Sequence, residues 1–239
     1  MSSGLVRITL REVEQRCVAT LGASGLFEAS VSATARRIVA AERDRCQSHG
    51  LFRLPGFCNA LRSGKACGTS VPEVVDAAAG VVRVEARGGL SPLALEVGIP
   101  AVAAKARSQG VAALCVKDAF HFSALWHEVE ALADGGLVGL AFLNTKGFVA
   151  PHGAASTGAV FGTNPMAFAA PRPGGAPPLL WDQASAAMAR GEISLKLQAG
   201  EPLPPGVAVD VDGAPTTDPK RARVARRPRS LPVPRGARP

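Results

Sequence analysis

The stretch VAALCVKDAFHFSALWHEVEALADGGLVGLAFL, residues 111–143, decides the fold. Residues 111–116 and 137–143 are apolar runs of strand length, which predict two buried strands. Between them, residues 123–134 have the spacing of a helix that Gly135 and Gly136 close. A strand, a helix and a second strand in succession predict an α/β domain in which helices cover a sheet.

The flanking sequence extends this alternation toward the C-terminus and replaces it with helices toward the N-terminus. Strands are expected at 81–84, 166–169 and 179–182, and a helix at 94–109 that contains Pro100. Before them lie three predicted helices, which begin at Thr9, Ser32 and about Gly56. Thr9 and Glu12 have capping-box spacing, and Gly50 is expected to stop the second helix, which spans 32–46.

Composition indicates a globular protein without a membrane span. Apolar residues make up 47% of the 239 residues, and no run of about 18 apolar residues occurs. The N-terminus carries early charges and no apolar signal core, so we expect a cytoplasmic protein. Five scattered cysteines then predict reduced thiols, and the spacing of Cys46, His49, Cys58 and Cys67 matches no metal-binding pattern.

The net charge of +8 lies entirely at the C-terminal end of the chain. Residues 219–239 contain eight of the 27 Lys and Arg residues and no acidic residue, which leaves 19 basic against 19 acidic residues before them. A nucleic-acid partner is therefore not expected for the body of the protein. The sequence also lacks a Rossmann G-x-G-x-x-G after a strand, a phosphate-binding loop and a G-x-S-x-G nucleophile elbow.

The segment CQSHGLFRLPG, residues 46–56, concentrates groups that bind and transfer protons. Ser48, His49 and Arg53 bring a hydroxyl, an imidazole and a guanidinium within six residues. Two further candidates follow predicted strands: His121, which is also readable as a packed histidine, and Asp182, which is also readable as a helix cap. Thr163 and Asn164 have the composition of a turn.

These residues occur within a set of motifs that resembles the type-2 malate/L-lactate dehydrogenase family, whose members are nicotinamide-dependent, non-Rossmann oxidoreductases and usually dimers. The motifs, in chain order, are SHGLFRLP, HFSALW, APHG, FGTNPMAFAAPR, DQASAAMARG and LPPGVAVDVDGAPTTDP. The resemblance covers roughly residues 10–218. It implies an α/β fold with a helical N-terminal segment and a non-Rossmann nicotinamide-binding sheet domain.

The resemblance also implies a role for each candidate residue. Ser48 and His49 would line the substrate pocket, and Arg53 would bind the substrate carboxylate through its planar fork. His121 would be the catalytic histidine beside the nicotinamide, with Asp182 near the cofactor and the histidines. The residues expected to hold the dinucleotide are His121, Asn144, Thr145, Thr163, Asn164 and Asp182.

Three segments look most like delta-1-piperideine-2-carboxylate/delta-1-pyrroline-2-carboxylate reductases: HFSALWHEVEALADGGLV, PHGA and GEPLPPG. We therefore expect reduction of a cyclic imino acid to L-pipecolate or L-proline with NADPH, or alternatively NADH. A 2-hydroxy acid (malate- or lactate-type) dehydrogenase is the first alternative. A non-catalytic remnant or a basic-tailed binding protein is the second.

Two departures from the family pattern accompany this reading. Relatives carry more polar residues where this chain has Ala119 and Phe120 before the histidine. After Asp218 the family pattern stops, and an Arg- and Pro-rich text follows that resembles an off-frame translation. We expect residues 1–75 to be the helical part of a substrate domain and 76–218 to be an incomplete NAD(P)-binding domain. Residues 219–239 would be a disordered or off-frame tail, with a genuine basic binding tail as the alternative.

Overall fold

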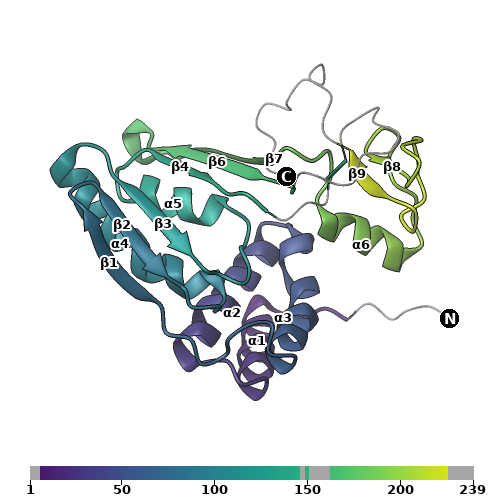
Figure 1. Ribbon diagram of the computed structural model, residues 1–239, viewed down its shortest axis with the longest axis horizontal. Helices are drawn as coiled ribbons and strands as arrows, with labels where there is room; N and C mark the ends of the chain where they lie inside the picture. The colour runs from purple at the N-terminus through teal and green to yellow at the C-terminus, as the bar shows by residue number, and fades with distance from the viewer. Residues whose placement is uncertain (1–5, 146–148, 151–161, 226–239) are drawn as a thin grey trace. The chain divides into compact units, whose positions relative to one another are not determined.

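The computed structural model describes residues 6–145, 149–150 and 162–225, and these divide into two compact units, Met1–Ser123 and Ala124–Pro239. The first unit contains helices, two short 3-10 turns and one sheet (Figure 1). Its elements are α1 (Leu10–Ala23), α2 (Glu28–Arg43), η1 (Gln47–His49), η2 (Leu51–Arg53), α3 (Leu54–Arg62), β1 (Glu73–Ala78), β2 (Val81–Glu85), α4 (Ser91–Gln109) and β3 (Ala113–Lys117).

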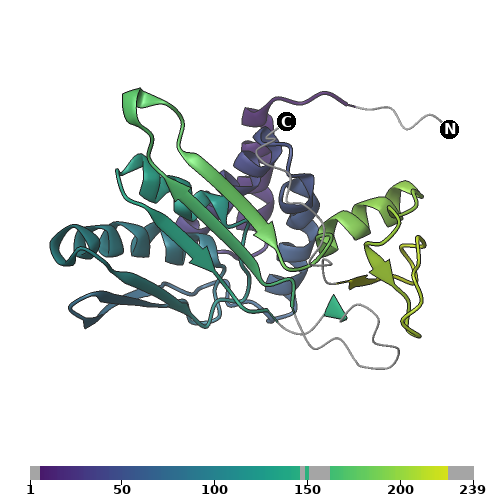
Figure 2. The same cartoon turned by 90° about the horizontal axis from the view of Figure 1, so that it is seen from above.

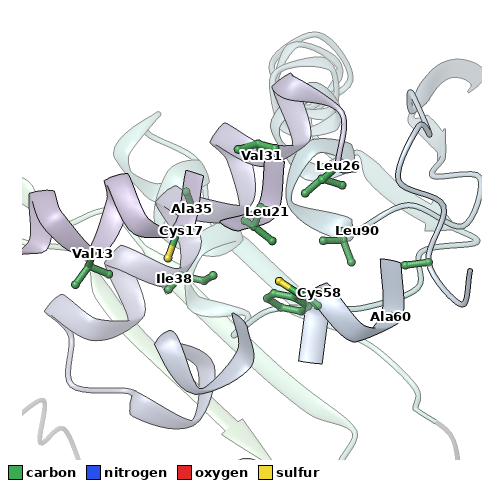
Figure 3. Packing of buried hydrophobic residues seen from close by; sticks show 12 residues of the cluster. Val13, Cys17, Leu21, Leu26, Val31, Ala35, Ile38, Cys58, Ala60 and Leu90 are labelled. Carbon is green, nitrogen blue, oxygen red and sulfur yellow. The ribbon is translucent and has the colours of Figure 1, made fainter. Parts of the chain in front are cut away.

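A capping box starts the first helix, and one apolar core holds the helices of the first unit together. Thr9 accepts a hydrogen bond from the Glu12 backbone N–H, and the Glu12 carboxylate accepts one from the Thr9 N–H, so the predicted capping box is confirmed. One core joins α1, α2 and α3, and Figure 3 shows its apolar side chains facing one another. The residues labelled there are Val13, Cys17, Leu21, Leu26, Val31, Ala35, Ile38, Cys58, Ala60 and Leu90.

The sheet of the first unit is mixed, since β2 pairs with β1 antiparallel and with β3 parallel. Helix α4 lies against it, and a Cβ on Gly98 would come within 2.9–3.0 Å of Leu114 and 3.0 Å of Val84. The helix therefore approaches the sheet as closely as a residue without a side chain allows. The prediction that residues 111–116 form a buried strand is wrong in its burial: residues of β3 alternate between exposed and half-buried, although α4 packs against this strand.

The second unit contains a three-stranded antiparallel sheet in the order β4-β6-β7, and Figure 2 shows these strands side by side. A second, small sheet in the order β5-β9-β8 lies near α6. The elements are α5 (Trp126–Asp134), β4 (Gly139–Phe142), β5 (Val149–Ala150), β6 (Pro165–Ala170), η3 (Pro173–Gly175), β7 (Leu179–Ala184), α6 (Arg190–Ala199), β8 (Ala208–Val209) and β9 (Arg223–Ala225).

The buried Val129 and Ala133 of helix α5, with Leu125 just before the helix, pack on one face of the larger sheet. The opposite face carries exposed apolar side chains, among them Leu140 and Phe142, which are 57% and 72% exposed. The prediction that residues 137–143 form a buried strand is therefore wrong in its burial. An apolar run in the sequence does not show whether one face of the strand or both faces are covered by other elements.

The predicted α/β class is confirmed, and the sheets and helices lie close to the expected ranges. The second helix ends at Arg43 rather than at Cys46, so Gly50 does not stop it. Of the tail, the structure describes residues 219–225, of which the last three form β9. The division into a substrate and a cofactor domain at residue 75 concerns function and stays a prediction. Within the described ranges, no helix is long and apolar enough to cross a membrane.

Candidate active site

Two 3-10 turns at the end of α2 carry the residues of the SHGLFR motif. The His49 N–H donates to the Cys46 carbonyl at 2.8 Å, and the Arg53 N–H donates to the Gly50 carbonyl at 2.9 Å. Gly50 separates the two turns, and α3 follows directly after Arg53. The backbone therefore holds the imidazole and the guanidinium on consecutive turns, between two helices that belong to one core.

The His49 ring is held through its Nδ1 atom. Nδ1 lies 3.1 Å from the hydroxyl of the buried Ser48 and 3.4 Å from the Sγ atom of Cys46. Burial and then the Arg53 charge lower the pKa of His49 to about 4. The imidazole is thus neutral at pH 7, because both effects disfavour its charged form.

His121 follows β3, and backbone contacts with residues 89 and 90 fix its position. The Phe120 N–H donates to the Gly89 carbonyl at 2.9 Å, and His121 forms a parallel bridge with Leu90. The edge of the Phe57 ring contacts the His121 ring, with 4.5 Å between centroids and 75° between planes. Neither ring nitrogen, both of which are buried, has a hydrogen-bond partner in the part of the chain that the structure describes. Buried polar atoms in folded proteins nearly always have a hydrogen-bond partner, so these two nitrogens could bind a polar ligand.

Electrostatic interactions link three of the four predicted site residues of the first unit, His49, Arg53 and His121. Burial, then Arg53, then His49 lower the pKa of His121 well below 6.5. The Arg53 guanidinium lies 5.8 Å from the centre of the Phe57 ring, which also contacts His121. The structure therefore brings Ser48, His49, Arg53 and His121 together, and it adds Phe57 as the ring between the guanidinium and the second histidine.

In the second unit, Asp182 lies on β7 and caps α5. Its Oδ2 atom accepts hydrogen bonds from the backbone N–H groups of Leu125 at 2.8 Å and Trp126 at 3.1 Å. Asp182 keeps an exposed edge, yet desolvation by the surrounding protein raises the pKa of its carboxyl to about 6 against the effect of these two bonds. Asp182 thus does cap a helix, although the helix lies 57 residues earlier in the sequence.

Four of the residues predicted to hold the dinucleotide lie in two segments of the second unit, 144–145 and 163–164, which a hydrogen bond between Thr145 and Asn164 joins. The Asn164 side-chain oxygen accepts from the Thr145 N–H at 3.0 Å, and Asn164 has a left-handed backbone with φ 43°. The Thr163 carbonyl accepts from the Ser185 N–H at 2.9 Å. Asn144 is exposed beside Thr145. The PHGA segment, 151–154, which contributes to the family resemblance, lies outside the described residues.

Three neighbours of the predicted residues were not anticipated. Phe57 could have been found from its place on the apolar face of α3, four residues after Arg53. Cys46 lies two residues before Ser48, but the sequence analysis considered it only as a possible metal ligand. Glu42 accepts a hydrogen bond from the Leu51 N–H, which no local pattern indicates. Across the described residues, no group of three or more His, Cys, Asp or Glu side chains could hold a metal ion.

The sequence matches the Malate/L-lactate dehydrogenase family over residues 8–236, and the chain belongs to this family. It is 49% identical over 214 residues to the Delta(1)-pyrroline-2-carboxylate/Delta(1)-piperideine-2-carboxylate reductase of Pseudomonas aeruginosa, covering 90% of this chain and 63% of that protein. It is 48% identical over 217 residues to the Delta(1)-pyrroline-2-carboxylate reductase of Ancylobacter novellus, covering 91% and 63%.

The fold is that of a solved relative as well. The crystal structure of delta1-piperideine-2-carboxylate reductase from Pseudomonas syringae pvar. tomato aligns with a TM-score of 0.85 at 36% identity, over 93% of this chain and 67% of that one. The resemblance inferred from the motifs is therefore confirmed. The chain spans about 63% of the length of the two reductases that it matches in sequence.

Proposed function

We propose that the protein is an NAD(P)H-dependent oxidoreductase that reduces the C=N bond of a cyclic imino acid. The substrates would be Δ1-pyrroline-2-carboxylate or Δ1-piperideine-2-carboxylate, and the products L-proline or L-pipecolate. The observation that carries the proposal is the group formed by Arg53, His49 and His121, with the buried nitrogens of His121 unpaired within the described residues. Relatives at 49% and 48% identity, named as such reductases, support the choice of substrate.

Arg53 would bind the substrate carboxylate, because a planar guanidinium donates two parallel hydrogen bonds to a carboxylate. Ser48 and His49 would then line the side of the ring that carries nitrogen. His49 is held by Ser48 through Nδ1, so its other nitrogen is the atom that would meet the substrate. The reduced nicotinamide, when bound, supplies the hydride to the imine carbon.

The nitrogen of the substrate must gain one proton for each hydride that the carbon gains. His49 and His121 are both neutral at pH 7 in the free protein, because burial and then the Arg53 charge lower their pKa values. A substrate carboxylate on Arg53 offsets that charge and so raises the proton affinity of both imidazoles. We propose that substrate binding itself prepares a histidine to hold the proton that the nitrogen receives.

Each unit, taken by itself, offers polar groups of the kind that a dinucleotide needs, and in the first unit these are the ring nitrogens of His121. Thr145, Thr163, Asn164 and Asp182 offer hydroxyl, amide and carboxylate groups that suit the hydroxyls and the carboxamide of a dinucleotide, and Asn144 is exposed beside them. The unpaired nitrogens of His121 fit such a polar ligand. We propose NADPH as the preferred form, with NADH as the alternative, and a cytoplasmic homodimer as the assembly.

A 2-hydroxy acid dehydrogenase is the second candidate function, and one observation favours it. A histidine that is neutral at pH 7 accepts a proton from a hydroxyl, which is what oxidation of malate or lactate requires. Arg53 would bind the carboxylate of either substrate in the same way.

Spectroscopy at 340 nm with the purified chain separates the two candidates. Consumption of NADPH on addition of Δ1-piperideine-2-carboxylate supports the imine reductase, whereas production of NADH from NAD⁺ and malate or lactate supports the dehydrogenase. If neither reaction proceeds although the chain is folded by circular dichroism, the proposed activity is wrong for this chain, and a binding role becomes the reading to test. Light scattering of the same sample gives the mass that tests the dimer.

A further inference from the structure

We infer that Glu42 is a positioning residue that fixes the loop bearing His49 and Arg53. The inference rests on the proposed function, because it assigns Glu42 to the same active site. Glu42 lies in the last turn of α2, four residues before Cys46. Its carboxylate bonds to the backbone of the loop, so it would act through the loop.

The contact falls at the junction of the two 3-10 turns. Glu42 Oε1 accepts a hydrogen bond from the Leu51 N–H at 2.7 Å. Leu51 opens η2, two residues after His49 and two before Arg53. A single carboxylate oxygen on a helix of the core therefore tethers the backbone midway between the two groups that would handle the substrate.

Gly50 shows how closely the same carboxylate approaches the loop. A Cβ at this position would lie 2.0 Å from Glu42 Oε1 and 2.6 Å from Cδ. Any other residue would thus displace the carboxylate from the loop. The glycine of the SHG motif has a packing reason that involves Glu42, and not the helix-stop role that its place in the sequence suggested.

The position of Glu42 is otherwise unfavourable. An acidic side chain in the last turn of a helix lies near the negative end of the helix dipole. A residue that breaks a local rule commonly does so at a functional site. The hydrogen bond to Leu51 provides the compensating interaction here.

The test uses the full chain and four variants: Glu42→Ala, Glu42→Gln, Gly50→Ala and the double variant Glu42→Ala/Gly50→Ala. Glu14→Ala, which truncates an exposed glutamate of α1, is the matched control. Two readouts are needed: hydrogen exchange of the Leu51 amide by NMR, and KM and kcat for Δ1-piperideine-2-carboxylate with NADPH. The slowest exchanging amides report global stability.

In Glu42→Ala the Leu51 amide should exchange about tenfold faster or more, as expected for a lost hydrogen bond to a charged acceptor. KM should rise by about tenfold, since Arg53 loses its fixed place, while Glu42→Gln keeps an acceptor oxygen and stays within about threefold of the wild type. Gly50→Ala should change Leu51 exchange and KM as Glu42→Ala does. In the double variant, Gly50→Ala should change both quantities little beyond the effect of Glu42→Ala, because the carboxylate with which its Cβ would clash is absent.

Unchanged exchange at Leu51 in Glu42→Ala would overturn the inference, and so would faster exchange with KM and kcat unchanged. A uniform acceleration of all amides, equal in Glu42→Gln, would also overturn it, since it would show a stability effect alone. If the wild type has no turnover, the proposed function fails, and Leu51 exchange together with the non-additivity of the two substitutions still decides the role of Glu42.

Discussion

Replacing His49 with asparagine should make the fold less sensitive to acid. The His49 imidazole has a pKa of 6.5 in an unfolded chain and about 4 in the folded protein, where burial and Arg53 disfavour its charge. Between these values the unfolded chain binds a proton that the folded chain does not, so the free energy of unfolding falls as pH falls through this window. From pH 7.5 to pH 5.0 the loss is about 2 kcal/mol, at 1.36 kcal/mol per pKa unit.

Asp182 changes the free energy of unfolding with pH in the direction opposite to His49. The pKa of Asp182 is raised from 3.8 to about 6, so the folded chain takes up that proton first and gains stability on acidification below about pH 6. The two effects oppose each other in the wild type. The informative quantity is therefore the difference between wild type and His49→Asn, in which the Asp182 contribution cancels.

Urea unfolding followed by circular dichroism at 222 nm, at pH 7.5 and 5.0, measures this difference. Most of the helix lies in the first unit, whereas Trp126 and Trp181 both lie in the second, so tryptophan fluorescence serves as the internal comparison. Equal acid sensitivity of the two proteins by circular dichroism would refute the assignment of a lowered pKa to His49. So would an NMR titration that places the ring near pH 6.5.

Three further predictions concern single residues of the site. Arg53→Lys should mainly raise KM for the imino acid, since a point charge replaces a two-pronged clamp, and an unchanged KM would remove Arg53 from carboxylate binding. His121→Ala should lower kcat strongly while the fluorescence titration with NADPH shifts less; wild-type turnover would exclude a catalytic role. Asp182→Ala should destabilise the second unit by about 1 kcal/mol through loss of the α5 cap, read from tryptophan fluorescence in urea, and no change would show that the cap contributes nothing.

The parts of the fold that depend on neighbouring residues could be read from the sequence. The start of α1 follows from Thr9 and Glu12, whose side chains complete each other's hydrogen bonds across one turn. The α/β class follows from apolar runs that alternate with helical spacing. Family motifs added Arg53, His49 and His121, which the structure does bring together although His49 and His121 lie 72 positions apart in the chain.

The parts that depend on distant residues could not be read in this way. Asp182 caps a helix that precedes it by 57 residues, so its sequence surroundings indicate the wrong helix. Leu140 and Phe142 are exposed because α5 covers the other side of the sheet, and the sequence of an apolar strand does not indicate which side a helix will cover. Glu42 is likewise visible only once the turn at Gly50 brings Leu51 back to α2.

Arg53 connects these observations into one chemical scheme. Burial lowers the pKa of His49 and of His121, and the Arg53 charge lowers both further, so that neither imidazole is charged at pH 7 in the free protein. In the proposed reaction, a substrate carboxylate bound to Arg53 would offset the part of this effect that comes from the Arg53 charge, when the substrate nitrogen needs a proton. A molecule without a carboxylate would leave both histidines neutral. The same guanidinium would therefore select the substrate and make proton transfer depend on the substrate being bound, and the loop that Glu42 holds in place sets both functions.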